Sequence, residues 1–181
     1  MKFYGAMLLL LFCLLTPKPA AAGTLTRYQG LHSAVRAAGN LIPQVQQASA
    51  TDQDQMLCMA LNIYHEIRGK SARDQWAVAF VTYNRTKRSA FNARNICSVV
   101  WAPGQFSWTR WSMRAQLPRE KAAWAESQQK AALLLSGEKM NDPTNGSTHF
   151  YQARLNPGWA RRLVSKVRIG AHMFAKLPGS N

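Results

Sequence analysis

Apolar residues recur at helical spacing in the middle of the chain. One face of the predicted helix carries Leu57, Ala60, Leu61 and Tyr64, and a neighbouring face carries Met59, Asn62, Ile63 and Glu66. This spacing is typical of an amphipathic helix. Thr51 suits the N-terminal cap, because the acidic residues after it favour the positive end of the helix dipole. Gly69 suits the C-terminal stop. The pattern therefore places one carboxyl, that of Glu66, in the last turn.

Further elements follow from the same kind of pattern. We predict helices over residues 71–87, 95–101 and 121–135, with Pro118 at the first helical position of the last one and Gly137 at its end. Residues 105–114 are expected to form an aromatic loop, and residues 141–146 a turn. Residues 148–152 and 163–169 alternate as strands do and are expected to pair as a hairpin with a long connection. The predicted fold class is α+β, mainly helical, with a small antiparallel β-sheet near the C-terminus.

The N-terminus has the pattern of a secretory signal peptide. Lys2 precedes an apolar run over residues 7–15, and small residues at 20–22 form a cleavage site. The run is too short for an ordinary membrane-spanning helix, although an uncleaved anchor is the alternative. The predicted organisation is a signal peptide over 1–22, a weakly ordered lead-in over 23–50 with one short helix near 31–41, and a single main domain over 51–181.

The charge of the chain is strongly positive. Without Lys2 and Lys18, which belong to the predicted signal peptide, 21 Lys and Arg residues remain against 8 Asp and Glu. Such a surface attracts anionic polymers. Nucleic acid is not the expected partner, because export argues against it and the basic residues are spread along the chain. The expected partner is the cell envelope, reached in the periplasm or outside the cell, with membrane contact only during export and with the protein as a monomer.

Two cysteines, Cys58 and Cys97, remain after the predicted signal peptide is removed. An even count in an oxidising compartment predicts a disulfide. Two buried free thiols are the alternative.

The histidines do not predict a metal site. His65 and Glu66 resemble the start of the H-E-x-x-H zinc motif, but Gly69 stands where the second histidine is required. His149 and His172 could approach each other through the predicted hairpin, but two histidines without further ligands make a poor zinc site. We predict no metal and no cofactor, and we expect both histidines to be buried and hydrogen-bonded.

Six segments together resemble the SleB-type cell wall hydrolase family, which acts on peptidoglycan. The matching segments are residues 61–69 (LNIYHEIRG), 77–79 with Asn84-Arg85, 96–100, 104–109 (GQFSWT), 142–146 with 148–151 (THFY), and 170–174. They occur in the order that the family has and cover roughly residues 55–175. The resemblance is greatest to the single-domain forms of Gram-negative bacteria and their phages.

The resemblance implies a lysozyme-like or lytic-transglycosylase-like fold for residues 51–181, with Glu66 as the catalytic acid of the Tyr-x-Glu-x-Arg-Gly motif. The chain differs from many family members at Lys70, where they have Glu. If that second acid assists the reaction in relatives, its absence here affects the rate or the pH dependence.

Glycosidic cleavage requires a proton on the leaving oxygen and therefore a carboxyl with a raised pKa. The end of a helix and the apolar neighbours Met59 and Ile63 would raise the pKa of Glu66, while Arg68 and Lys70 would lower it if they came close. No strong second carboxylate is evident. This favours a lytic transglycosylase, which needs one carboxyl to break the β-1,4 bond between N-acetylmuramic acid (MurNAc) and N-acetylglucosamine (GlcNAc).

Two alternatives to the lytic transglycosylase are retained. A hydrolytic muramidase would use Asp74 or Asp142 as its second carboxylate. A non-catalytic protein that binds the envelope through its charge is the alternative from a different class.

The residues expected to bind peptidoglycan glycan strands surround Glu66. They are Gln105, Phe106, Ser107, Tyr151, His149 and Asn62. Amides and hydroxyls suit sugar hydroxyls, and aromatic faces suit pyranose rings. Core packing is an equally good interpretation of Phe106, Trp108 and Trp111, and it is the better one for Tyr64.

Overall fold

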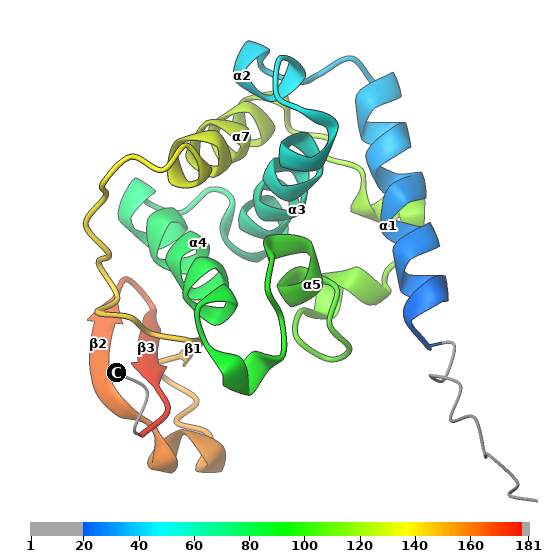
Figure 1. Cartoon of the computed structure of the whole chain (residues 1–181). Helices are drawn as coiled ribbons and strands as arrows, with labels where there is room; N and C mark the ends of the chain where they lie inside the picture. The colour runs from blue at the N-terminus through cyan, green and yellow to red at the C-terminus, as the bar shows by residue number, and fades with distance from the viewer. Residues whose placement is uncertain (1–19, 179–181) are drawn as a thin grey trace, which may run out of the picture.

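The structure, a computed structural model, describes residues 20–178 (Figure 1). The α-helices are α1 (Ala20–Ala37), α2 (Pro43–Gln46), α3 (Ala50–Ile67), α4 (Ala72–Thr86), α5 (Ile96–Val100), α6 (Met113–Gln116) and α7 (Lys121–Leu135). The 3-10 helices are η1 (Ser89–Phe91), η2 (Ser107–Arg110) and η3 (Gly158–Arg162). The strands are β1 (His149–Gln152), β2 (Val164–Ile169) and β3 (His172–Lys176). The predicted α+β class, mainly helical with a small antiparallel sheet, is confirmed.

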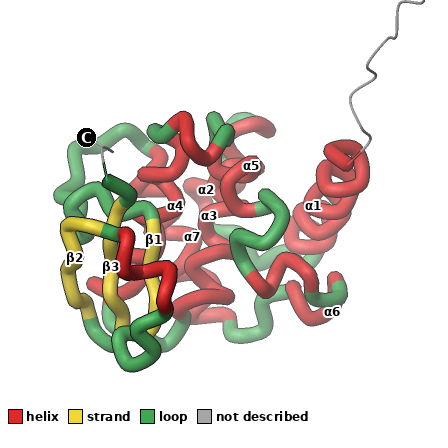
Figure 2. The backbone as a smooth tube through the Cα atoms, turned by 90° about the horizontal axis from the view of Figure 1, so that it is seen from below, coloured by secondary structure: helices red, strands yellow, loops and turns green. Residues whose placement is uncertain are grey.

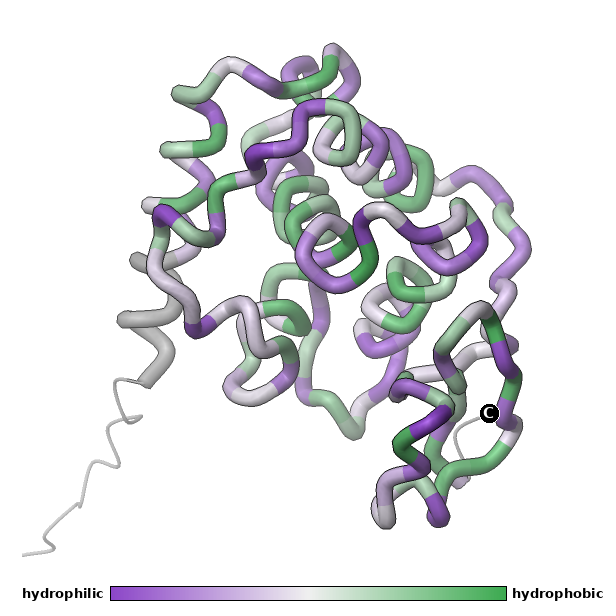
Figure 3. Tube along the Cα trace, turned by 180° about the vertical axis from the view of Figure 1, so that it is seen from behind, coloured by the Kyte–Doolittle hydropathy of each residue, from purple (hydrophilic) through white to green (hydrophobic). Residues whose placement is uncertain are grey.

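Helix α3 lies in the centre of the molecule and packs against α4, α5 and α7 (Figure 1). Its second half is buried almost all round, with Leu57, Leu61 and Ile63 fully inaccessible to solvent. Figure 3 shows hydrophobic positions on the helices in the middle of the molecule and hydrophilic positions on its outer loops. Because both ends of α3 reach the surface, a residue in its last turn can be held rigidly and still face solvent.

The boundaries of two predicted helices differ from those observed. The N-terminal cap of α3 is Ser49 rather than Thr51, and its hydroxyl accepts a hydrogen bond from the backbone N–H of Asp52 (3.2 Å). Helix α7 begins at Lys121, so Pro118 precedes the helix and does not occupy its first position. In both regions the sequence offers several residues suited to a helix start, and tertiary packing selects among them.

The sheet has the strand order β1-β3-β2, with both pairings antiparallel (Figure 2). The predicted hairpin between the first two strands is wrong, because β3 lies between them. Phe174 of β3 is opposite Phe150 of β1 and Val167 of β2. Strand β3 was not predicted as a strand. Its five residues follow β2 after a turn at Gly170-Ala171, and the central position of β3 depends on contacts across the sheet rather than on its own pattern.

The segment 23–50 differs from the predicted weakly ordered lead-in, because it contains all but the first turn of α1 and the short helix α2. Leu31 and Val35 of α1 lie in the hydrophobic core. His32 is fully buried, and its Nδ1 atom lies 2.9 Å from Oδ1 of Asp54 on α3. Arg36 donates to the same carboxylate (2.6 Å). Residues 1–19, most of the predicted signal peptide, lie outside the described residues.

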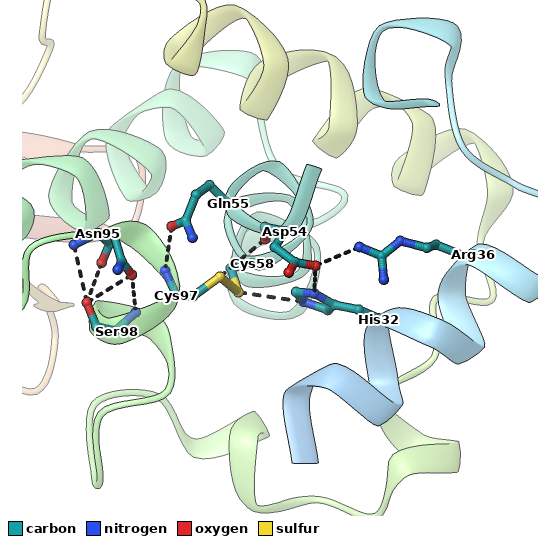
Figure 4. Close-up of a disulfide and its surroundings, with 8 residues drawn as sticks. All are labelled: His32, Arg36, Asp54, Gln55, Cys58, Asn95, Cys97 and Ser98. Atoms are coloured by element: carbon teal, nitrogen blue, oxygen red, sulfur yellow. Dashed lines mark hydrogen bonds and ion pairs between the residues drawn. A yellow bond between two sulfur atoms is a disulfide. The ribbon is translucent and has the colours of Figure 1, made fainter. Parts of the chain in front are cut away.

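A disulfide joins Cys58 of α3 to Cys97 of α5, as predicted (Figure 4). Gln55 supports the same junction, because its side-chain carbonyl accepts from the backbone N–H of Cys97 (3.1 Å). The bond fixes α5, and with it the start of the chain that leads to residues 105–107, against the helix that carries Glu66. None of the helices in the part of the chain that the structure describes is long and apolar enough to cross a membrane.

Candidate active site

Glu66 lies in the last turn of α3 and is half-buried. Within residues 20–178, its carboxyl makes no hydrogen bond and no ion pair. Burial raises the pKa of Glu66, and the positive charge of Arg85 opposes this rise. A carboxyl that is partly desolvated and has no structural partner keeps its proton to a higher pH than an exposed carboxyl does, and it can donate that proton.

The other acidic residues have structural roles or lie exposed at the surface. Asp52, Asp54, Asp74, Glu120, Glu126 and Asp142 each interact with another side chain or with backbone N–H groups. Glu138 lies exposed after the end of α7. Because these residues and Glu66 make up all eight acids of the chain, Glu66 is the one half-buried carboxyl that is not committed to holding the fold together.

Arg85 of α4 is the charged neighbour of Glu66, and its side chain is only 6% exposed. Its Nε atom donates to the carbonyl oxygen of Thr148 (2.7 Å). Its guanidinium lies 5.3 Å from the ring centres of both Phe91 and Phe106. The Nη1 atom is buried without a hydrogen-bond partner in the described structure. Burial lowers the pKa of Arg85 to about 10, and Glu66 opposes this change.

Arg85 belongs to one of the six segments that resemble the family, and no role was predicted for it. A signal for its position was available in the spacing. Arg85 follows Val78 and Val81 by seven and four residues, and both valines are buried. That periodicity places a permanently charged side chain on the buried face of α4, which is costly unless the charge has a task or a partner.

Neither Arg68 nor Lys70, which would lower the pKa of Glu66 if they came close, is among the charges that act on it. Arg68 donates to Glu120 across a surface ion pair of 2.8 Å, and its guanidinium lies 4.8 Å from the ring centre of Tyr64. Lys70 is exposed. The predicted rise of the Glu66 pKa through burial agrees with the structure, but the opposing charge comes from α4 rather than from the end of α3.

Three of the predicted substrate-binding residues form one segment. Phe106 is 4% exposed and packs beside Arg85, so it belongs to both the core and the site. Gln105 and Ser107 flank it and are exposed. Their side chains are therefore available to a ligand on the outer side of the loop, while Phe106 fixes the loop to the helices beneath it.

Asn62 lies in the core, and its predicted role in substrate binding is wrong. The residue is fully buried, its amide nitrogen donates to Thr82 (3.0 Å), and its amide oxygen accepts from the indole N–H of Trp108 (3.0 Å). Both polar groups of this side chain are used within the protein. Asn62 therefore acts as a polar link between α3, α4 and η2.

His149 and Tyr151 lie on β1. His149 is half-buried, its Nδ1 lies 3.0 Å from the hydroxyl of Thr148, and its ring centre lies 5.8 Å from that of Phe91. Burial lowers the pKa of His149, and the charge of Arg85 lowers it further. Tyr151 is 9% exposed. We call Glu66, Arg85, Phe91, Phe106 and His149 the Glu66–Arg85 cluster.

His149 and His172 do not approach each other as the sequence suggested. In the β1-β3 register, His149 is opposite Ala175, and His172 is opposite Gln152 at the other end of β1. The Nδ1 atom of His172 is buried without a partner in the described chain, so the expected hydrogen bond is absent at that atom. The part of the chain that the structure describes contains no group of three or more His, Cys, Asp or Glu residues that could hold a metal ion.

The two carboxylates considered as second catalytic groups are engaged elsewhere. Asp74 caps α4 together with Ser71. Asp142 closes a turn by accepting from the backbone N–H groups of Thr144 (2.7 Å) and Gly146 (2.8 Å) and from the side chain of Asn84 (2.9 Å). Neither residue is among the charges that shift the pKa of Glu66.

Cavities in the described part of the chain lie away from the Glu66–Arg85 cluster, including one of about 460 Å³ beside Met56 and Leu133 and the following two. One, of about 590 Å³, is lined by residues that include Gln55, Tyr83 and Lys87. The other, of about 220 Å³, is lined by residues that include Tyr64 and Trp111. Glu66 lines none of them.

Comparison with known proteins gives a family and a fold. The family model of the cell wall hydrolases matches residues 69–175, which is more than half of the chain. This span contains Arg85, residues 105–107 and all three strands, and it begins three residues after Glu66. No match was found among curated protein sequences.

Two solved structures are similar to this chain. The catalytic domain of the germination-specific lytic transglycosylase SleB from Bacillus anthracis is 24% identical and has a TM-score of 0.55, covering 72% of this chain and 98% of that one. The catalytic domain of the Bacillus cereus SleB protein is 23% identical and has a TM-score of 0.53, covering 75% of this chain and 98% of that one. At these identities the likeness establishes the fold.

Proposed function

The chain belongs to the cell wall hydrolase family and is an enzyme that cleaves peptidoglycan, and we propose that it does so as a lytic transglycosylase with Glu66 as both general acid and general base. The bond that breaks is the β-1,4 linkage between MurNAc and GlcNAc. The observation that carries the proposal is the state of Glu66, a half-buried carboxyl with a raised pKa and with no hydrogen bond in the described chain.

The proposed reaction uses a single carboxyl twice, first as an acid and then as a base. Protonated Glu66 donates to the glycosidic oxygen as the bond from that oxygen to C1 of MurNAc breaks, and positive charge develops at C1. The 6-hydroxyl of the same MurNAc attacks C1 and gives its proton to the Glu66 carboxylate. The products are a 1,6-anhydro-MurNAc end and a GlcNAc 4-hydroxyl, and no water is consumed.

Arg85 supports both halves of this cycle. Burial favours the protonated acid before donation, and the nearby guanidinium stabilises the carboxylate that remains afterwards. The two effects oppose each other, which keeps the pKa of Glu66 above its ordinary value without fixing the proton permanently. A general acid works best when its pKa lies near the working pH.

A hydrolytic muramidase is the second candidate, and the arrangement of carboxylates disfavours it. Hydrolysis by the usual route needs a second carboxylate beside the scissile bond. Asp74 and Asp142 both serve as caps of local structure. Membership of an enzyme family also sets aside the non-catalytic envelope-binding protein.

The proposed site of action is the cell wall, in the periplasm or outside the cell. Peptidoglycan lies beyond the cytoplasmic membrane, and the predicted signal peptide would carry the chain there. The excess of basic residues would favour contact with the acidic envelope. The protein is proposed to act as a monomer without a cofactor.

The test combines two variants with product analysis. Glu66→Gln should lower the rate of release of soluble muropeptides from purified sacculi roughly 100- to 10,000-fold, the range that general acid–base groups contribute. Glu138→Gln removes the exposed carboxyl after α7 and should leave the rate unchanged. Mass spectrometry should find anhydro-MurNAc ends. Full activity of Glu66→Gln would refute the assignment, and ends that carry added water would establish a muramidase.

A further inference from the structure

Trp159 is the most exposed of the six tryptophans. It lies in η3 and is 51% exposed. Trp101, Trp108 and Trp124 are buried. The only other strongly exposed indole is that of Trp111, at 44%. Because burying an indole is strongly favourable, an indole held with one side in solvent is a candidate for ligand contact.

The position of Trp159 is fixed by neighbouring rings. Its ring centre lies 5.5 Å from that of Tyr151 in an edge-on arrangement and 6.1 Å from that of His149. Ala160, the next residue, is fully buried and anchors η3 beneath the sheet. The indole is therefore pre-positioned, so that binding a ligand to it would cost little side-chain entropy.

Ring contacts connect Trp159 to Arg85, the residue whose charge acts on Glu66. Trp159 contacts His149, whose ring also lies 5.8 Å from Phe91. Arg85 lies over Phe91 and acts electrostatically on both His149 and Glu66. Trp159 thus borders the Glu66–Arg85 cluster on the side formed by the sheet, whereas residues 105–107 border it on the helical side.

The chain around Trp159 is free of negative charge. No Asp or Glu occurs after Asp142. Arg161 and Arg162, which follow Trp159 in η3, are exposed. Within the described residues, none of the ion pairs involves either arginine. An exposed indole followed in the same 3-10 helix by two exposed arginines outside the ion pairs suits a ligand that offers an apolar ring face and carboxylates.

We propose that Trp159 is the stacking platform of a saccharide subsite that binds a pyranose of the glycan strand, with Arg161 and Arg162 binding the carboxylates of its acidic substituents. This inference rests on the proposed function and adds a specificity determinant to it. The C–H face of a pyranose packs on the indole, while the lactyl or peptide carboxylates of a muramic acid residue reach the arginines. The subsite thereby favours strands whose muramic acid residues carry free carboxylates over uncharged strands.

The test measures binding in the Glu66→Gln background, in which turnover is slow compared with the binding measurement. The probes are a GlcNAc tetramer, which has no charge, and a muropeptide tetrasaccharide that carries stem peptides. Trp159→Ala should weaken the binding of both probes roughly tenfold or more, as expected for the loss of an aromatic contact. Trp159→Phe should retain most of the affinity. Leu133→Ala, which removes an exposed apolar side chain of α7, should bind as the background does. Calorimetry gives these affinities without relying on indole fluorescence.

The arginines are tested with the same two probes. Arg161→Gln combined with Arg162→Gln should weaken the binding of the acidic muropeptide and leave that of the uncharged tetramer unchanged, and added salt should reduce the difference. The inference is overturned if Trp159→Ala binds as tightly as the background, or if the arginine variant affects both probes equally.

Activity measurements test the role of Trp159 in binding separately from the role of Glu66 in the reaction. In the active enzyme, Trp159→Ala should raise KM for sacculi and change kcat little, because a stacking platform binds the ground state and the transition state alike. A failure of Glu66→Gln to abolish cleavage would refute the mechanism but not the binding results. Unaltered binding by Trp159→Ala would refute the subsite but not the mechanism.

Discussion

Arg85 and Glu66 influence each other's protonation, although no ion pair joins them. The charge of each residue opposes the effect that burial has on the pKa of the other. Arg85 is held by Thr148 and by the rings of Phe91 and Phe106 rather than by Glu66. The carboxyl thus experiences a fixed positive charge and keeps its oxygens free, which suits a group that must release and recover a proton.

This relationship predicts a change in the pH dependence of activity. A general acid must be protonated, so kcat/KM falls as pH rises through the pKa of Glu66. Because Arg85 lowers that pKa, Arg85→Gln should move this limb of the profile to higher pH, and Arg85→Lys should move it less. Rates on sacculi measured across the pH range give the profiles. A limb that stays in place in Arg85→Gln would contradict the electrostatic coupling.

The fold is expected to lose stability in acid because of its buried histidines. All four have pKa values lowered by burial, and that of His65 falls to about 4. A histidine whose pKa is lower in the folded state than in the unfolded state binds its proton more readily when the chain unfolds. The free energy of unfolding is therefore at its full value above about pH 6.5 and decreases as pH falls toward the folded-state pKa. For His65 the loss is at most roughly 3 kcal/mol. Urea unfolding at pH 7.5 and 4.5 measures it.

His65→Gln provides the comparison for that measurement. The Nε2 atom of His65 donates to the carbonyl oxygen of Gln116 (2.9 Å), and a glutamine amide can donate in its place. The variant lacks the titrating group, so its free energy of unfolding should fall less between the two pH values than that of the natural protein. Equal losses in both proteins would show that His65 does not contribute.

The disulfide is expected to stabilise the fold substantially. Cys58 and Cys97 are 39 residues apart, and closing such a loop contributes about 4 kcal/mol in the chain-entropy description. Replacing both cysteines by alanine should lower the free energy of unfolding by about this amount, as measured by urea titration. A reducing agent should produce a similar loss in the natural protein and none in the double variant.

Gly170 is predicted to be intolerant of a side chain. It has a φ of +53°, and an added Cβ would lie 2.9 Å from Cγ of Asp74. Gly170→Ala combines backbone strain with a steric clash and should cost at least about 2 kcal/mol. Gly137, with a φ of +83° and open space around it, is the control, and Gly137→Ala should cost about 1 kcal/mol.

A double variant isolates the steric part of the Gly170 effect. In an Asp74→Ala background the clash is removed while the positive φ remains. Gly170→Ala should then cost about as much as Gly137→Ala does. A cost that is unchanged by the removal of Asp74 would mean that the clash is relieved in another way.

The sequence determined the features that depend on local pattern. The helices over residues 72–86 and 121–135 agree closely with those predicted, because their apolar spacing and caps lie within the segment itself. The position of Glu66 in a last turn follows from the same periodicity and from Gly69. The pairing of Cys58 with Cys97 followed from there being two cysteines in the predicted mature chain.

Only the tertiary structure decided which distant groups meet. Strand β3 lies between β1 and β2, and Asn62 turned out to be a core residue, because both outcomes depend on contacts with other elements. The charge beside Glu66 comes from Arg85, 19 residues away, instead of from Arg68, two residues away. Local spacing fixes the face on which a side chain lies, whereas the packing of helices and strands determines what that face contacts.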